Sequence, residues 1–291
     1  MIFVKKIKLL LIGLILTSLT GCIKKDSFED IEIYTTVYPI EYIVNYLYSE
    51  NSVITSIYPN GVDTKKYELN SKQIKDYSKM DLYVFNGINT KENEYITSMF
   101  KYNKNLKIID ATQTMEYGYD EEELWIDPSN FLMMALNIKN GLLEYTTNHY
   151  LKTEIEERYD ELKIAISKVD ANLKLLSENA TNKTIIVDNS AWKFLTKYDF
   201  NVISLEENDE LTEKIILEAT NLIKNEQVDY IFTTNIDSLN STVTKILNEY
   251  NVEVLELNSI YNLTDEEHNN KEDYLTLLNE NVELLKNEVY D

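Results

Sequence analysis

The segment 150–180, YLKTEIEERYDELKIAISKVDANLKLLSENA, decides the fold, and it contains neither glycine nor proline. Its apolar residues lie alternately four and three positions apart, which places them on one face of an α-helix. These residues are Ile155, Tyr159, Leu162, Ile166, Val169, Leu173 and Leu176. We expect one helix of about 28 residues, which at 1.5 Å per residue spans roughly 42 Å. A coiled-coil segment is the alternative, but strand-like runs on both sides favour a helix that runs along two domains.

Short apolar runs of strand type alternate with helical segments on both sides of this helix. The pattern predicts an α/β fold, with two similar α/β domains whose parallel sheets are joined by one long rigid helix. We expect domains at 31–148 and 181–291, with the linking helix at 149–180. The expected strands are 31–37, 52–58, 81–87 and 106–110 before the helix, and 183–189, 201–207, 228–235 and 252–258 after it. The expected later helices are 191–198, 210–225, 237–250 and 272–288.

The amino-acid composition argues against two classes of function. The chain has 291 residues, of which 44% are hydrophobic, and a formal net charge of −22. The hydrophobic content supports folded cores, whereas the acidic excess argues against nucleic acid, which needs a basic surface. Only six glycines are present, and the glycine-rich phosphate-binding motifs are absent. A nucleotide-using enzyme is therefore disfavoured.

The N-terminus has the layout of an export signal, with lysines followed by an apolar run and then Leu19-Thr20-Gly21-Cys22. This end resembles the bacterial lipobox, in which the chain is cleaved before a cysteine that carries lipid. We expect a signal peptide at 1–21, lipidation at Cys22 and a tether at 22–30, which would anchor the protein to the outer face of the cell membrane. Cys22 is the only cysteine, so the chain can form neither an internal disulfide nor a thiolate metal site.

Several stretches in order resemble one family across residues 31–290. They are VYPI (37–40), YPNGVDTKKYELNSKQIKDYSKMDLYVFNG (58–87), LWIDP (124–128), TIIVDNSAWKFL (184–195) and EDYLTLLNENVELLK (272–286). Together with the lipobox they resemble the zinc/manganese solute-binding lipoproteins of ABC importers. The resemblance implies a metal-binding cleft between two α/β domains, a permease and an ATPase as partners, and no enzymatic activity. It also implies zinc or manganese as the bound ion.

The family's ligand positions can be carried over one by one, and none of them holds a histidine here. The first falls on Lys65, the second on Glu123 and the third on Asn189, where the family has histidine or glutamate. The fourth, an acid in the family, falls on Glu272, with Asp273 as the adjacent candidate. The proline that precedes the first ligand is also replaced, by Thr64.

Four interpretations of this cleft remain open. Glu123, Asn189 and Glu272 could form an all-oxygen site, which suits manganese, magnesium or calcium better than zinc. Alternatively, Lys65 takes the place of the metal and pairs with Glu123 and Glu272, with the Asn189 carbonyl as a third partner. The cleft could also be wet and empty, or hold an amine-bearing or zwitterionic solute. We favour Lys65 as an internal cation.

The two histidines of the chain are not expected to bind metal. The chain has two histidines, His149 between predicted helices and His268 in a polar loop, and we expect both at the surface. Lys66 is expected to be solvated.

We therefore predict a monomeric, membrane-anchored solute-binding lipoprotein of an ABC importer with a degenerate metal site. A pseudo-receptor or adhesin-like surface protein that no longer binds metal is the alternative. A hydrolase with Glu123 and Glu272 as paired carboxylates is disfavoured, because nothing in the sequence positions a substrate.

Overall fold

The computed structural model describes residues 28–116 and 123–290. The predicted signal peptide, Cys22 and most of the tether lie outside the described residues. Of the described helices, none combines the length and the apolar character that a membrane crossing requires.

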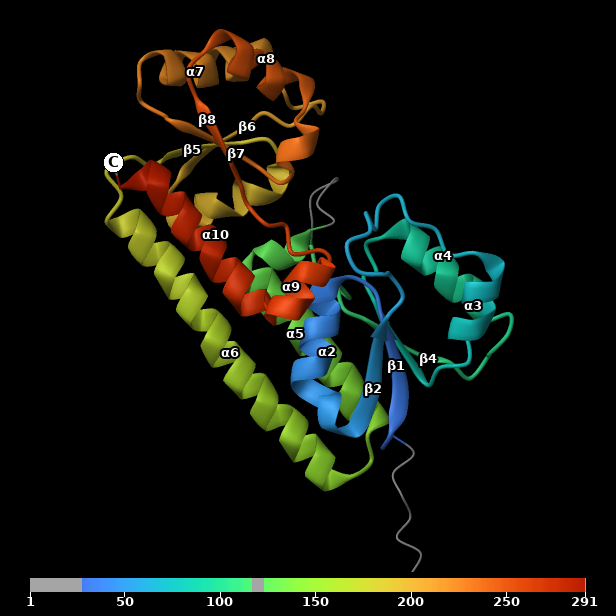
Figure 1. Cartoon of the computed structure of the whole chain (residues 1–291). Helices are drawn as coiled ribbons and strands as arrows, with labels where there is room; N and C mark the ends of the chain where they lie inside the picture. Colours follow the sequence, from blue (N-terminus) through green and yellow to red (C-terminus); the bar gives the residue numbers. More distant parts are fainter. Residues whose placement is uncertain (1–27, 117–122, 291) are drawn as a thin grey trace, which may run out of the picture.

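The N-terminal sheet holds four parallel strands in the order β2-β1-β3-β4. Ile33 of β1 lies opposite Ile54 of β2 and Leu82 of β3. The strands are β1 (Ile31–Thr35), β2 (Ser52–Ser56), β3 (Leu82–Phe85) and β4 (Lys107–Asp110). All of β3 is buried, because helices cover both faces of the sheet. Two of them, α3 (Ser71–Tyr77) and α4 (Thr90–Met99), lie on the outer face (Figure 1).

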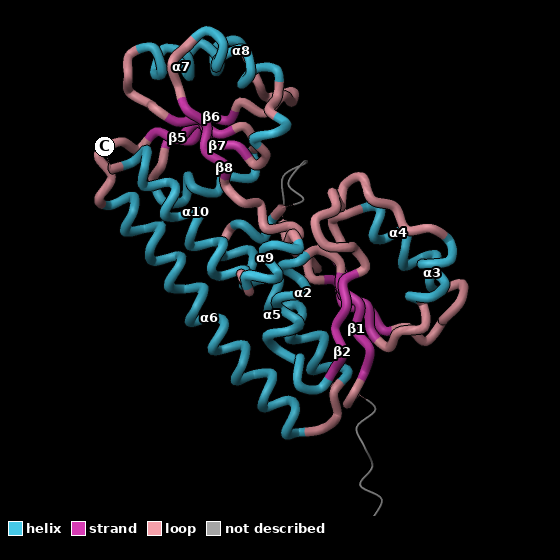
Figure 2. The backbone as a smooth tube through the Cα atoms, viewed as in Figure 1, coloured by secondary structure: helices cyan, strands magenta, loops and turns pink. Residues whose placement is uncertain are grey.

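The C-terminal sheet repeats this arrangement with four parallel strands in the order β6-β5-β7-β8. The strands are β5 (Thr184–Val187), β6 (Asn201–Ser204), β7 (Tyr230–Thr233) and β8 (Glu253–Glu256). Helices α7 (Glu213–Lys224) and α8 (Ser241–Glu249) pack on its outer face (Figure 2). Along β5, Ile186 faces these helices, whereas Ile185 and Val187 join the core on the opposite face.

One layer of helices covers the inner faces of both sheets. It consists of α2 (Tyr38–Tyr48), α5 (Pro128–Tyr145), α6 (His149–Glu178) and α10 (Tyr274–Val289). Helix α6 runs along both sheets (Figure 1), and its 30 residues correspond to about 45 Å at 1.5 Å per residue. Six of the seven residues of the predicted stripe are buried, and the seventh, Tyr159, packs against the same core. The predicted long helix and the two parallel-sheet α/β units are therefore confirmed.

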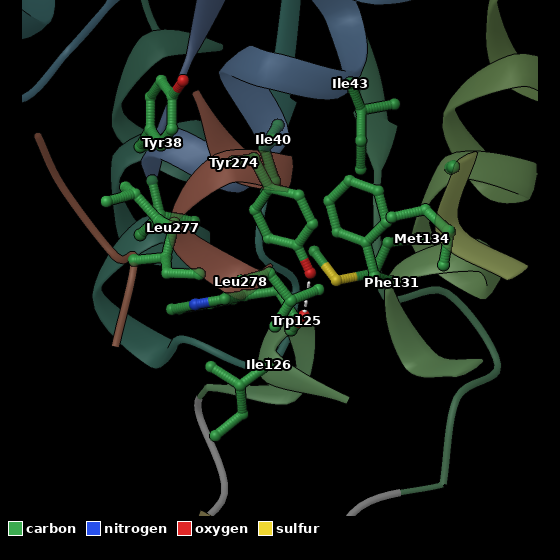
Figure 3. Packing of buried hydrophobic residues seen from close by; sticks show 14 of the residues in the cluster. Tyr38, Ile40, Ile43, Trp125, Ile126, Phe131, Met134, Tyr274, Leu277 and Leu278 are labelled. Atoms are coloured by element: carbon green, nitrogen blue, oxygen red, sulfur yellow. Dashed lines mark hydrogen bonds between the residues drawn. The ribbon is translucent and has the colours of Figure 1, made fainter. Parts of the chain in front are cut away.

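Aromatic residues connect this layer to the loops between the sheets (Figure 3). The rings of Phe131 in α5 and Tyr274 in α10 stack with centroids 3.9 Å apart. The Tyr274 hydroxyl donates a hydrogen bond to the Trp125 carbonyl oxygen. Trp125 Nε1 in turn donates to the carbonyl oxygen of Ser259, at 2.7 Å. Trp125 belongs to a 3₁₀ turn, η2 (Leu124–Ile126), just before α5, so this chain of contacts fixes the turn against the segment that follows β8.

Two short elements differ from the sequence prediction. The segment predicted as a helix at 191–198 is a 3₁₀ helix, η3 (Ser190–Tyr198), which ends where Asp199 adopts a left-handed conformation at φ 67°. The polar stretch around His268, predicted as a loop, forms the short helix α9 (Asp265–Asn270). Its Thr264–Glu267 capping box stabilises the first turn without any apolar periodicity.

The segment that follows β8 crosses to the N-terminal sheet and is bonded to the loop after β2. Asn262 Nδ2 donates to the carbonyl oxygens of Pro59 and Val62, at 2.9 and 3.0 Å. The backbone N–H of Gly61 donates to Leu263 O at 2.8 Å. Gly61 adopts φ +69°, a conformation that glycine accepts without a steric cost.

An ion pair ties η3 to the start of α5. Lys197 Nζ contacts Asp127 Oδ2, and the Asp127 side chain is 3% exposed while that of Lys197 is 48% exposed. The Asp127 carboxylate also caps α5 by accepting a hydrogen bond from the N–H of Ser129, at 3.0 Å.

We expect Lys197→Met to lower the free energy of unfolding by about 2 kcal/mol, because it leaves a buried carboxylate without its cation. Because the lysine is half-exposed, the loss of unfolding free energy should be smaller than for a fully buried ion pair. The matched control is Lys193→Met, which removes an ion pair with the exposed Glu210 and should cost clearly less, because solvent screens that pair. Urea denaturation of both variants checks this, and equal losses would contradict it.

Glu288, near the end of α10, is a buried carboxylate with only 4% exposure. It accepts hydrogen bonds from Asn182 Nδ2 at 2.5 Å and from the N–H groups of Asp229 and Tyr230 at 3.1 and 3.0 Å. Burial raises the pKa of Glu288 to about 7 from its usual 4.5, and these hydrogen bonds only partly oppose the rise. Between these two values the folded protein holds a proton that the unfolded chain releases, so stability is lost as pH rises.

The difference in unfolding free energy between the wild type and Glu288→Gln should therefore fall by about 2 kcal/mol from pH 5 to pH 8. Denaturant titration at the two pH values measures it. Glu280→Gln, at an exposed position of the same helix, is the control and should leave the pH dependence as in the wild type. A difference that stays constant or grows with pH would contradict the assignment.

Candidate functional site

The four carried-over positions all follow the carboxyl ends of strands, where open α/β sheets bind ligands. Lys65 follows β2 and Glu123 follows β4 in the N-terminal sheet. Asn189 follows β5, and Glu272 lies between α9 and α10, after β8 of the C-terminal sheet. The hydrogen bonds between Asn262 and the loop after β2 bring these two sets of loops together.

Lys65 and Glu123 form an ion pair. Lys65 Nζ lies 3.1 Å from Glu123 Oε1, and the two side chains are 59% and 8% exposed. Two further contacts hold the backbone of Lys65: its N–H donates to Asp63 Oδ1 at 3.0 Å, and its carbonyl oxygen accepts from Lys91 Nζ at 2.8 Å. A lysine amine with three donors thus lies beside a buried carboxylate at a position where the resemblance implies a metal ligand.

The charges of this pair affect the pKa of the Tyr261 hydroxyl. Burial raises the pKa of Tyr261, the carboxylates of Asp63 and Glu123 raise it further, and the amines of Lys65 and Lys66 oppose the rise. Lys66 itself is 86% exposed and pairs with Asp63 at 2.9 Å, as expected for a solvated lysine.

Asn189 and Glu272 have local partners. Asn189 caps η3, its side-chain oxygen accepting from the N–H of Ala191 at 2.8 Å. Glu272 Oε1 accepts from Asn270 Nδ2 at 3.2 Å, and its N–H donates to Glu267 O at 3.0 Å. Asp273, the adjacent candidate, caps α10 by accepting from the N–H of Thr276 at 2.8 Å.

The structure therefore brings together two of the four predicted site residues. Within residues 28–116 and 123–290, neither Asn189 nor Glu272 forms a hydrogen bond or ion pair with Lys65 or Glu123. Across the same residues, no group of three or more histidine, cysteine, aspartate or glutamate side chains could hold a metal ion. His149 begins α6 and His268 lies in α9, and both are exposed.

A cavity of about 320 Å³ lies between the Glu123–Asp127 turn and η3. Two buried carboxylates, Glu123 and Asp127, line it together with the amines of Lys193 and Lys197 and the ring of Phe194. The predicted site residues other than Glu123 do not line this cavity.

Sequence reasoning missed Asp127, Lys193 and Lys197. Asp127 lies in the LWIDP stretch but was given no role of its own. The two lysines are four positions apart in the segment predicted as a helix after the third ligand position. That spacing could have indicated a basic face turned toward the cleft.

The carboxylate of Asp188 lies at the end of β5, next to the third ligand position. It accepts hydrogen bonds from the Thr233 hydroxyl and from the N–H of Thr234, the latter at 3.3 Å. Burial raises the pKa of Asp188, the two hydrogen bonds oppose this rise, and the charge of Glu206 adds to it. Asp188 thus connects the carboxyl ends of β5 and β7, the two central strands of the sheet.

The sequence is similar to those of zinc- and manganese-transport lipoproteins. It is 24% identical over 313 residues to the zinc-binding lipoprotein AdcA of Streptococcus pneumoniae, covering 97% of this chain and 60% of AdcA. It is 26% identical over 204 residues to the manganese ABC transporter substrate-binding lipoprotein PsaA of Streptococcus pneumoniae, covering 65% of each chain. The chain thus spans about three fifths of the length of AdcA.

The fold is similar to that of the metal-dependent lipoprotein YcdH of Bacillus subtilis, whose crystal structure superposes with a TM-score of 0.73 at 17% identity. The likeness covers 90% of this chain and all of that one. A family model, zinc-uptake complex component A, periplasmic, matches residues 33–288. The resemblance inferred from the sequence is therefore confirmed, and with it the prediction of a substrate-binding protein rather than an enzyme. Since the match spans nearly the whole described fold, the chain belongs to the family of the zinc-uptake component ZnuA.

Proposed function

We propose that this protein is the solute-binding lipoprotein of an ABC importer, with a metal site that has become degenerate. Membership of the ZnuA family and the names of the relatives support the transport role. We propose that Cys22 carries the lipid anchor, that the protein acts as a monomer at the outer face of the membrane, and that a permease and an ATPase are its partners. Since AdcA is longer than this chain, these roles are inferred for the part of it that the chain matches.

The observation that carries the degenerate site is the contact between Lys65 and Glu123. An ammonium 3.1 Å from a carboxylate occupies the place where a divalent ion would have to approach. Like charges repel at this range, by about 4 kcal/mol for two unit charges 4 Å apart near a protein surface. A metal ion would have to displace Lys65 and recruit Asn189 and Glu272 from their local hydrogen bonds.

The purified protein should therefore contain no stoichiometric zinc or manganese, and neither ion should raise its melting temperature. A ligand at 100 times its dissociation constant stabilises by about 2.7 kcal/mol, so binding would give a visible shift. Elemental analysis and a thermal screen with Zn²⁺, Mn²⁺, Mg²⁺, Ca²⁺ and Fe²⁺ make the measurement. Tight stoichiometric binding of any of these ions would refute the degenerate site and favour a working metal receptor.

The triple substitution Lys65→His, Glu123→His and Asn189→His should create affinity for zinc. It removes the competing ammonium and supplies three imidazole ligands, with Glu272 available as a fourth. Zinc should then stabilise the variant by at least about 2 kcal/mol in thermal melts at saturating ion. The matched control carries Lys66→His in place of Lys65→His, since Lys66 is exposed and paired with Asp63. Equal zinc stabilisation of the two variants would show that Lys65 does not occupy the first ligand position.

A further inference from the structure

The cavity beside η3 is too large for a single ion. Its volume of about 320 Å³ exceeds the roughly 30 Å³ that one water occupies and falls at the lower end of the range for organic ligands. Its lining combines charged groups of both signs with apolar surface from Phe194 and the buried Leu124. Such a lining suits a small polar organic molecule.

The two carboxylates are buried, whereas the amines that pair with them are about half-exposed. Glu123 and Asp127 are 7% and 2% exposed, so neither can turn its charge into water. Their partners, Lys65 and Lys197, are 59% and 48% exposed, and each amine ends a flexible four-carbon chain. Lys197 lines the cavity and can therefore leave Asp127 and remain solvated at the rim, whereas Lys65 contacts Glu123 from outside the lining.

The contrast between buried carboxylates and exposed amines determines which ligand charges the cavity can accept. A simple cation would have to compete with a lysine tethered in place, whose effective concentration is on the order of millimolar. A simple anion would pull a lysine away and leave a buried carboxylate without its cation, which is costly. A molecule that carries both charges can insert into an ion pair, with its ammonium on the carboxylate and its own carboxylate on the displaced lysine. Every charge then keeps a partner.

A polar group beside the ion pairs remains available for recognition. Asn130, in the first turn of α5, lines the cavity and is half-buried, and within the described residues its side-chain amide makes no hydrogen bond. Its carbonyl oxygen and NH₂ group could bond an ammonium and a carboxylate, respectively.

We propose that this cavity binds a small zwitterion of the size of a single amino acid, with one ammonium and one carboxylate, in place of a metal ion. Glu123 and Asp127 receive the ammonium, Lys197 receives the carboxylate, and Phe194 contacts the apolar part. This inference rests on the proposed function, because it names the class of solute that the binding protein would carry.

The test is calorimetric titration of the purified protein with the common amino acids one at a time. Each binder is then compared with its amide, which lacks the carboxylate, and its N-acetyl derivative, which lacks the ammonium. At least one free amino acid should bind. Each derivative should have a dissociation constant at least about ten times higher, as expected for the loss of a charged hydrogen-bonding group.

Two single variants and one control complete the design. Glu123→Gln should weaken binding of the free amino acid and its amide by a similar factor, while Lys197→Met should weaken the free amino acid more than the amide. Lys66→Met should bind as the wild type, because Lys66 pairs with Asp63 outside the cavity. Thermal melts of each variant without ligand separate lost binding from lost folding.

The outcomes separate this inference from the proposed function. An amide that binds as tightly as its amino acid would replace the zwitterion with an organic cation, and an equally tight N-acetyl derivative would replace it with an anion. If no amino acid binds, the zwitterion inference is overturned, whereas the degenerate metal site is judged only by the metal screen. Stoichiometric zinc or manganese that amino acids cannot displace would overturn both.

Discussion

Burial of the apolar stripe of α6 is the interaction on which the rest of the structure depends. Each parallel sheet has two apolar faces, and its own short helices cover only the outer one. The inner faces of both sheets are covered by a single layer, α2, α5, α6 and α10, in one continuous core. A fully buried Leu, Ile or Val contributes about 1.5 to 3 kcal/mol, so the stripe from Ile155 to Leu176 accounts for a large part of the stability.

The shared layer determines where the chemistry can occur. Because the helices that contact the two sheets pack together on α6, the loops after the strands of both sheets meet on one side. There Trp125 bonds to Ser259, and Asn262 bonds to the loop after β2. Charged groups at that junction face a cavity from two directions. Glu123 is neutralised from the N-terminal sheet, by Lys65, and Asp127 from η3, by Lys197. The charge balance of the cleft therefore involves elements of both halves of the chain.

Much of this architecture can be predicted from the sequence, because helices and strands bury faces with different periods. This difference in period is visible in the apolar stripe of α6 and in the alternation of strand-like and helical segments. Helix α9 does not, since its six polar residues are held by a capping box and by Lys271 in a left-handed conformation. At the site, the Lys65–Glu123 contact does not follow from the strand order, because β2 and β4 are the two edge strands of the N-terminal sheet. Glu272 bonds within its own turn, and the pairing of Lys197 with Asp127, 70 residues apart, has no local signature.

In the degenerate site that we propose, the two ion pairs replace metal coordination with lysine–carboxylate electrostatics. A carboxylate as buried as Asp127 requires a nearby cation whatever that cation is, because an uncompensated charge in a buried position costs several kcal/mol. A metal ion meets this need only with several ligands at fixed distances. A lysine on a long flexible stem meets it with one contact, and no other residue has to move. Unlike a metal, however, a lysine cannot be released with the solute, and this difference is why we propose a ligand that brings a compensating charge of its own.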